Sequence, residues 1–199
     1  GLYDAFVAEC EKIGLSIVET QTFTTTTNTD FSTQIDALVS SGVKLVFMPI
    51  YAEEASTFLT QAKGKFGSDV YFFGADGLDG ILGKVEQDPS IADNVLMLTP
   101  FAADSEEANV KAFVEAYKKA YNATPDQFAA DGYDAIYVIY NAMLKAGVNN
   151  VTVAPDVLGD AIVATVTAAD FSYKGLTGDM TWDVSGACNK IPVIVTLGE

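Results

Sequence analysis

The chain has 199 residues, of which 49% are hydrophobic and 19% charged, and its net charge is −16. All eleven basic residues are lysine, because the sequence contains neither arginine nor histidine. This composition is that of a globular chain and excludes a disordered one. The missing histidine excludes Ser-His-Asp and Cys-His catalysis and imidazole metal ligands, and the missing arginine excludes a bidentate clamp for phosphate. We expect no nucleic-acid partner, because so acidic a surface repels a polyanion.

The first hundred residues alternate between helical and strand-like apolar spacing. Gly14 is a natural stop for the opening helix, and Asp30 is a plausible N-cap for the second helix. The predicted helices cover the apolar positions within 2–13, 31–39, 55–66 and 80–87, and the predicted strands are 15–20, 44–50, 70–73 and 95–98. This alternation predicts an α/β fold whose parallel sheet carries helices on both faces.

The pattern changes after Pro100. Three helices follow one another without intervening strands, over about 104–121, 124–147 and 156–168, and strands are predicted at 179–183 and 191–196. Asp104 with Glu107 resembles a capping box, and Thr124-Pro125 suggests a cap and a first-turn proline. The tyrosines between Tyr117 and Tyr140 recur at helical spacing, which predicts core positions; the alternative is that one or two of them face a cleft. We therefore expect a second structural unit, with the chain crossing into it near residue 100.

Two residues follow the buried strands at the edge where ligands bind in open parallel sheets. Tyr51 comes one residue after Ile50, and Asp76 comes three residues after Phe73. A carboxylate there would pair with an ammonium group, and the phenol ring would cover apolar atoms. The alternatives are structural: Asp76 caps the helix begun at Leu78–Asp79, and Tyr51 packs on a neighbouring loop.

The sequence predicts no metal site and no cofactor. The glycines from Gly74 to Gly83 recur every three residues, which matches no phosphate-binding fingerprint and is better explained by turns. Cys10 stands at a periodic apolar position and is predicted to be buried, and whether it pairs with Cys188 is left open. No apolar run approaches the roughly 18 residues of a membrane span. Apolar residues at helical spacing begin at Leu2, so we expect this chain to be a piece of a longer protein.

An ordered series of short motifs resembles the second lobe of type I periplasmic binding proteins, most closely the branched-chain amino-acid (Leu/Ile/Val) binding family. The resemblance spans essentially the whole chain. Its motifs are Gly-Leu-Tyr-Asp-Ala-Phe at 1–6, Leu-Val-Phe-Met-Pro-Ile-Tyr at 45–51, Phe-Gly-Ala-Asp-Gly at 73–77, Phe-Val-Glu-Ala-Tyr at 113–117, Tyr-Asp-Ala at 133–135, Gly-Leu-Thr-Gly at 175–178 and Trp-Asp at 182–183.

The resemblance implies two α/β lobes joined by three crossovers, which close on a solute and deliver it to an ABC permease. Residues 1–100 and 189–199 would belong to the second lobe, and the mostly helical 101–188 would be part of the first. It implies an extracytoplasmic protein, in the periplasm or as a cell-surface lipoprotein, with no enzymatic activity. As a piece of such a protein, the chain is expected either to self-associate through an unprotected sheet edge or to have limited stability, and to bind a ligand weakly or not at all on its own.

Carried over by position, Asp76 matches the acidic residue that receives the ammonium of the ligand, Tyr51 matches the cleft tyrosine, and Phe128 falls where a first-lobe helix end reaches the cleft. We include Gly77 and Asp131, which neighbour these positions in the sequence. Asp76 is shorter than the glutamate of the best-known members, and Met48-Pro49-Ile50 replaces the small residues often found there. The alternative function is a ligand-sensing domain of a receptor or regulator; an enzyme on a flavodoxin-like or Rossmann-like sheet is a remote third.

Overall fold

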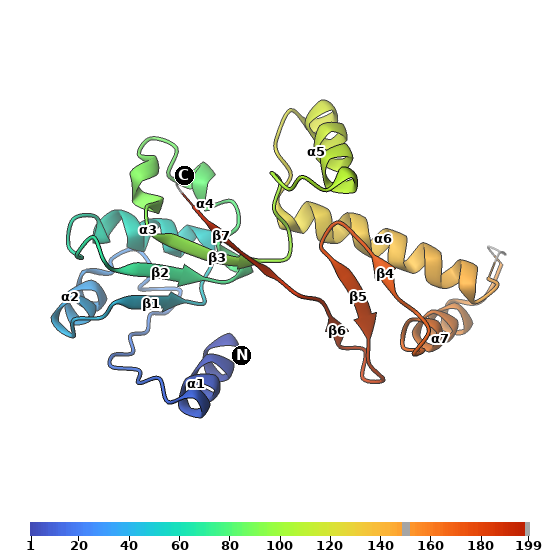
Figure 1. The fold of residues 1–199 in the computed structure, drawn as a ribbon, viewed down its shortest axis with the longest axis horizontal. Coiled ribbons are helices and arrows are strands. Elements are labelled where there is room, and N and C mark those ends of the chain that lie inside the picture. The colour runs from blue at the N-terminus through green and yellow to red at the C-terminus, as the bar shows by residue number, and fades with distance from the viewer. Residues whose placement is uncertain (149–151, 198–199) are drawn as a thin grey trace. The chain divides into compact units, whose positions relative to one another are not determined.

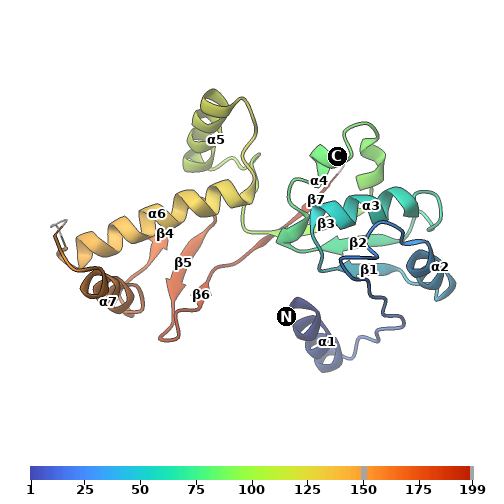
Figure 2. The same cartoon turned by 180° about the vertical axis from the view of Figure 1, so that it is seen from behind.

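The computed structural model describes residues 1–148 and 152–197, which form two compact units. The first unit comprises Gly1–Leu98 and Ile194–Glu199, and the second comprises Thr99–Val193. Figures 1 and 2 show the fold from opposite sides.

A four-stranded sheet is the centre of the first unit, with strand order β1-β2-β3-β7. The strands are β1 Leu45–Met48, β2 Tyr71–Gly74, β3 Val95–Thr99 and β7 Val193–Thr196. β1 and β3 both run parallel to β2. The chain returns to this sheet at its end, where the Leu197 N–H donates to the Val95 carbonyl at 2.9 Å. The α/β fold with a parallel sheet is thus confirmed, and β1 is an edge strand.

Helices lie on both faces of this sheet, as the sequence predicts. They are α1 Leu2–Ile13, α2 Ser32–Ser40, α3 Ala52–Ala62 and the short α4 Ile81–Lys84, with 3-10 turns at Asp76–Leu78 and Pro89–Ala92. Ile35 of α2 and Phe58 of α3 share a core with Val46 and Met48 of β1. The alternate residue Phe47 points to the opposite face, where Phe6 of α1 stacks on it with ring centroids 4.2 Å apart.

Two predictions for this unit need correction. Residues 15–20 form no strand: the chain has no regular secondary structure there, because the described residues place no strand beside it. The second helix begins one residue later than expected, with Phe31 as its N-cap. Asp30 nevertheless accepts hydrogen bonds from the backbone N–H and the hydroxyl of Ser32. Gly14 ends α1 in the left-handed conformation, at φ 74°, and Cys10 is buried, as predicted for both. The pairing that the sequence left open does not occur, since Cys10 and Cys188 are both free.

The second unit combines three helices with a small antiparallel sheet of order β4-β5-β6. The elements are α5 Ala108–Tyr121, α6 Gln127–Lys145, α7 Pro155–Val166, β4 Tyr173–Lys174, β5 Asp179–Trp182 and β6 Cys188–Asn189. Two expected caps are wrong. Glu107 itself is the N-cap of α5, and α6 begins after Asp126, whose side chain accepts from the Ala129 N–H at 2.8 Å.

The buried face of α6 also differs from the prediction. The helix buries a stripe of mostly small or polar side chains: Gln127, Ala130, Asp134, Val138 and Ala142. Tyr133, Tyr137 and Tyr140 are exposed, and so is Tyr121 of α5. Helical periodicity identified two faces of this helix correctly but assigned the core to the wrong one. The described residues cover the aromatic face only in part, through Phe113 of α5 against Tyr133.

The core of the first unit provides a direct test of this fold. Ile35 is fully buried (0% exposed), whereas Val39, one turn later on the same helix, is 39% exposed. Ile35→Ala is expected to lower the free energy of unfolding of the first unit by about 2–5 kcal/mol, because it leaves a cavity. Val39→Ala is the control and should cost about 0.5 kcal/mol or less. Urea denaturation followed by far-ultraviolet circular dichroism measures both; equal losses would contradict the packing described.

Candidate functional site

Parallel pairing brings the ends of β1 and β2 to the same edge of the sheet. Met48 and Gly74, the last residues of the two strands, are register partners. Tyr51 follows β1 as the N-cap residue of α3 and is 71% exposed. Asp76 follows β2 as the first residue of a 3-10 turn and is also exposed. Both sequence-predicted residues therefore lie at the carboxyl edge of the sheet.

Gly77 allows the two loops to lie close together. A Cβ atom at this glycine would lie 2.7 Å from the Ile50 carbonyl oxygen and 3.3 Å from Cδ1 of Tyr51. Only glycine allows this approach without moving backbone, because the first distance is shorter than any ordinary carbon–oxygen contact. Gly77 is thus a residue that brings Tyr51 next to the turn that carries Asp76.

The structural alternatives for these two residues have different outcomes. The N-cap residues of the turn at 76–78 and of α4 are Ala75 and Gly80, so Asp76 is the N-cap of neither. Tyr51 does contact a neighbouring loop at Gly77, as that alternative predicts, and still leaves most of its surface accessible. What remains at this edge is an exposed carboxylate and an exposed phenol on adjoining loops.

The other two candidates, Phe128 and Asp131, belong to the second unit, in the first turns of α6. Phe128 is 52% exposed. Asp131 forms an ion pair with Lys190, whose Nζ lies 2.7 Å from Oδ1 of the carboxylate. A ligand that used Asp131 would have to displace this lysine.

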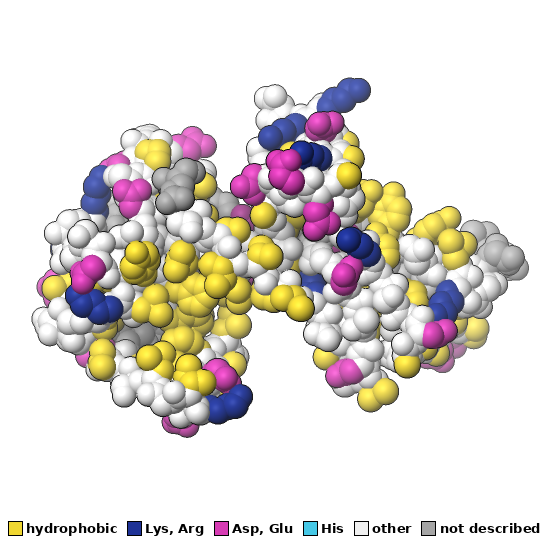
Figure 3. Space-filling view, in the orientation of Figure 1, with side chains coloured by type: hydrophobic (Ala, Val, Ile, Leu, Met, Phe, Trp, Pro, Cys, Tyr) yellow, Lys and Arg dark blue, Asp and Glu magenta, His cyan; other side chains and the backbone are white. Residues whose placement is uncertain are grey.

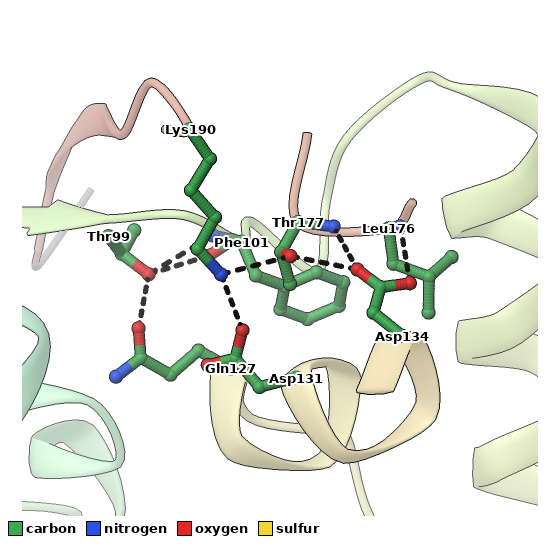
Figure 4. Close-up of polar contacts among 8 residues, drawn as sticks. All are labelled: Thr99, Phe101, Gln127, Asp131, Asp134, Leu176, Thr177 and Lys190. Atoms are coloured by element: carbon green, nitrogen blue, oxygen red, sulfur yellow. Dashed lines mark hydrogen bonds and ion pairs between the residues drawn. The ribbon is translucent and has the colours of Figure 1, made fainter. Parts of the chain in front are cut away.

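Asp134 is the centre of a polar network that the sequence analysis missed (Figure 4). Its carboxylate is 2% exposed and accepts from the backbone N–H groups of Leu176 and Thr177, each at 2.9 Å, and from the Thr177 hydroxyl at 2.8 Å. Lys190 extends the network by donating to Thr177 Oγ1 at 3.1 Å. Because both carboxylate oxygens are buried and accept from the loop at 175–177, this carboxylate fixes that loop to α6 and does not face a solute.

A second buried pair lies at the start of α6. The Thr99 hydroxyl donates to Oε1 of the buried Gln127 at 3.1 Å, and the Phe101 N–H donates to the same hydroxyl at 3.2 Å. The sequence does contain one signal for both networks, which is spacing. Gln127 and Asp134 are seven residues apart, or two helical turns, so they lie on the same helix face as Ala130 and Val138.

Tyr133 stands in an aromatic row on α6. Its ring centroid lies 5.0 Å from that of Phe113 and 4.7 Å from that of Tyr137. A hydrogen bond with Tyr137 is the main cause, and partial burial the second, that raises the pKa of the Tyr133 phenol to about 12.

Within residues 1–148 and 152–197, no three acidic or cysteine side chains come together as metal ligands. The same part of the chain holds no helix with the length and hydrophobicity of a membrane span.

The sequence matches the family model described as periplasmic binding protein over residues 1–190. The chain belongs to the periplasmic binding protein family. A search of curated protein sequences gave no match.

Solved structures of periplasmic binding proteins share the fold. A leucine binding protein, LivK, from Thermotoga maritima superposes with a TM-score of 0.78 at 24% identity, over 100% of this chain and 54% of that one. The branched-chain amino acid binding protein LivJ of Streptococcus pneumoniae, in complex with isoleucine, gives 0.67 at 24% identity, over 94% and 56%. A solute binding protein of R. palustris in complex with benzoate gives 0.74 at 18% identity, over 96% and 52%. The chain spans about half the length of these relatives.

The role assigned to Asp134 predicts a large loss of stability on truncation. Asp134→Ala leaves two buried N–H groups and a hydroxyl without an acceptor, so the free energy of unfolding should fall by about 3 kcal/mol or more. Trp182, the only tryptophan, lies in the second unit and reports its unfolding by fluorescence. Asp160→Ala, at an exposed position of α7, is the control and should stay within about 0.5 kcal/mol of wild type. A similar small effect at Asp134 would contradict the network.

The Tyr133–Tyr137 hydrogen bond predicts a measurable titration. Tyr137→Phe should bring the pKa of Tyr133 down from about 12 towards the ordinary value of 10.0, because the bond is the largest cause of the shift. A raised pKa stabilises the folded state below pH 10 and loses that contribution between pH 10 and 12, so the variant should show a smaller loss of stability over this interval. Nuclear magnetic resonance of the tyrosine Cζ carbons measures the titration. Tyr140→Phe is the control, and an unchanged Tyr133 pKa in Tyr137→Phe would refute the assignment.

Proposed function

We propose that this protein is the extracytoplasmic solute-binding component of an ABC importer and that it binds an amino acid or a similar small solute that carries an amine. It performs no chemistry on the solute and passes it to a permease. The observation that carries the proposal is the meeting of the β1 and β2 loops at Gly77, which sets Tyr51 and Asp76 on adjoining loops at the carboxyl edge of a periplasmic binding protein sheet.

The chemistry of the two side chains suits the two parts of such a solute. The carboxylate of Asp76 pairs with a primary ammonium and accepts its hydrogen bonds, an interaction that strengthens once the ligand excludes water. The ring of Tyr51 covers apolar atoms next to the ammonium, and its hydroxyl is a further donor and acceptor. The exposed phenol and the exposed carboxylate lie on adjoining loops, so one ligand can contact both.

The nature of the charged residues supports an amine-bearing solute over a purely anionic one. Solved relatives include a protein named for leucine, one in complex with isoleucine and one in complex with benzoate. Benzoate carries a carboxylate and no ammonium, so it would meet the like charge of Asp76. The chain offers no arginine for a carboxylate, and its net charge of −16 repels anions in general.

The role of Asp76 is tested by neutralising it in the full-length protein. Asp76→Asn keeps the size of the side chain and removes its charge, so the affinity for the amino acid should fall about 10- to 100-fold, the range expected when a desolvated ammonium loses its counter-charge. Isothermal titration calorimetry measures the affinity, after a thermal-shift panel of leucine, isoleucine and benzoate has identified the solute that raises the melting temperature.

Asp93→Asn is the matched control. It removes the same charge from an exposed aspartate that precedes β3, at the opposite edge of the sheet. The control should bind as wild type does. Unchanged affinity in Asp76→Asn, or a thermal shift with benzoate and none with the amino acids, would contradict the proposed recognition.

A further inference from the structure

Three aspartates of this chain stand directly before a glycine. Acidic side chains lie on both units in the face that Figure 3 shows, so an exposed carboxylate alone marks no special position. Asp76, Asp79 and Asp131 differ from the other aspartates because glycine follows each of them. In an Asp-Gly step the glycine nitrogen can attack the side-chain carboxyl carbon, since no Cβ blocks the approach. The rate of this attack depends on how the backbone holds the two groups.

The step from Asp79 to Gly80 has the reacting groups next to each other. The Gly80 nitrogen lies 2.8 Å from Oδ1 of Asp79, to which its N–H donates. Ring closure requires rotation about ψ of Asp79, which is 138° in the structure. Gly80 is exposed, with φ 83°, and apart from its neighbours in the chain no heavy atom lies within 4 Å of where a Cβ would stand. Among the described residues its N–H makes no backbone hydrogen bond, so this peptide is free to rotate.

The step from Asp76 to Gly77 is held by its surroundings. The Asp76 carbonyl belongs to the same peptide group as the Gly77 nitrogen, and it accepts from the Asp79 N–H at 3.0 Å. Gly77 is so close to the preceding loop that a Cβ there would lie 2.7 Å from the Ile50 carbonyl oxygen. Rotation of this peptide would break the hydrogen bond and press one backbone against another. The fold therefore opposes ring closure at Asp76.

The step from Asp131 to Gly132 lies inside α6, Gln127–Lys145. Helical hydrogen bonds engage both polar groups of a peptide in this position and fix its ψ. The Asp131 carboxylate is also held in the ion pair with Lys190, whose Nζ is 2.7 Å from Oδ1. Attack by the Gly132 nitrogen would require one turn of the helix to open and the ion pair to break.

We propose that Asp79 is a site of spontaneous isomerisation to isoaspartate, and that the fold protects Asp76 and Asp131 from the same reaction. The Gly80 nitrogen forms a bond to Cγ of Asp79 and loses its proton, and one carboxyl oxygen leaves as water, which gives a five-membered succinimide. Water then adds to one of the two ring carbonyls and opens the ring. One opening restores aspartate, and the other gives isoaspartate, whose main chain runs through the former side chain. Water is the only other reactant.

The isomer lengthens the main chain by one carbon between two anchored residues. Leu78 and Ile81, on either side of the step, are 0% and 1% exposed and belong to the core of the first unit. The longer segment begins at the end of the 3-10 turn that carries Asp76, so the modification acts next to the candidate site. Any effect on solute binding rests on the proposed function, but the modification itself does not.

Incubation of the full-length protein in oxygen-18 water tests the proposal. Hydrolysis of a succinimide places one oxygen-18 atom in the residue, and peptide mapping with electron-transfer fragmentation locates the label and distinguishes isoaspartate from aspartate. The labelled fraction at Asp79 should exceed the fractions at Asp76 and Asp131 at least about tenfold. A sample unfolded in urea should label all three at similar rates, because each precedes glycine and the fold no longer restrains them.

Asp79→Glu is the matched variant, because it keeps the charge but would need a six-membered ring, which closes far more slowly. The label at residue 79 should disappear in this variant. Gly132→Ala, which removes the Asp-Gly step from α6, is the control and should leave the label at Asp79 unchanged. Persistent label in Asp79→Glu would overturn the proposal, because the label would then not come from a succinimide.

Equal labelling of the three aspartates in the folded protein would also overturn the proposal. So would more label at Asp76 or Asp131 than at Asp79, or label at Asp79 in urea with none in the folded protein. Each readout is a covalent change, and none depends on binding of an amino acid. The proposed function therefore stands or falls separately.

Discussion

The in-register parallel pairing of β1 with β2 is the constraint on which the candidate site depends. Because Met48 and Gly74 are partners, both strands end at the same level. Only three residues separate β1 from α3, and one residue separates β2 from the 3-10 turn at Asp76–Leu78. The loops have to pass each other in this short space, and Gly77 is the residue without a side chain at the point of contact. Tyr51 and Asp76 are therefore neighbours for a backbone reason, before any ligand is considered.

The strands of this sheet could be predicted because their signal is local. Apolar runs such as 44–50 and 70–73 are short and bounded by turn residues, a pattern typical of strands in a parallel sheet between helices. The segment 15–20 carries a similar pattern, yet it forms no strand. A strand requires a hydrogen-bonding partner as well as a pattern, and the sequence of a segment does not state whether the partner is present. The positions of Tyr51 and Asp76 were predictable for the same reason as the strands, since each directly follows one.

The helix α6 shows where periodicity loses its power. Its aromatic face, with Tyr133 and Tyr137, has the larger side chains, and hydrophobicity alone favours it as the core. The structure instead buries the stripe of Ala130 and Asp134, because the loop at 175–177 brings two N–H groups and a hydroxyl that a carboxylate can satisfy. That compensation comes from residues more than forty positions away and is invisible within the helix. A buried aspartate among small residues is thus the mark of a long-range polar contact.

Both units expose apolar surface that the sequence pattern assigns to a core, but the two surfaces carry different information. The aromatic face of α6 exposes side chains alone. Dispersion forces and the hydrophobic effect are not directional, so a helix, a strand or a loop could cover these side chains equally well. The free edge of β1 exposes side chains together with N–H and C=O groups that repeat every second residue. Hydrogen bonds are directional, so these groups limit what can lie beside the edge more closely than an apolar face limits what covers it.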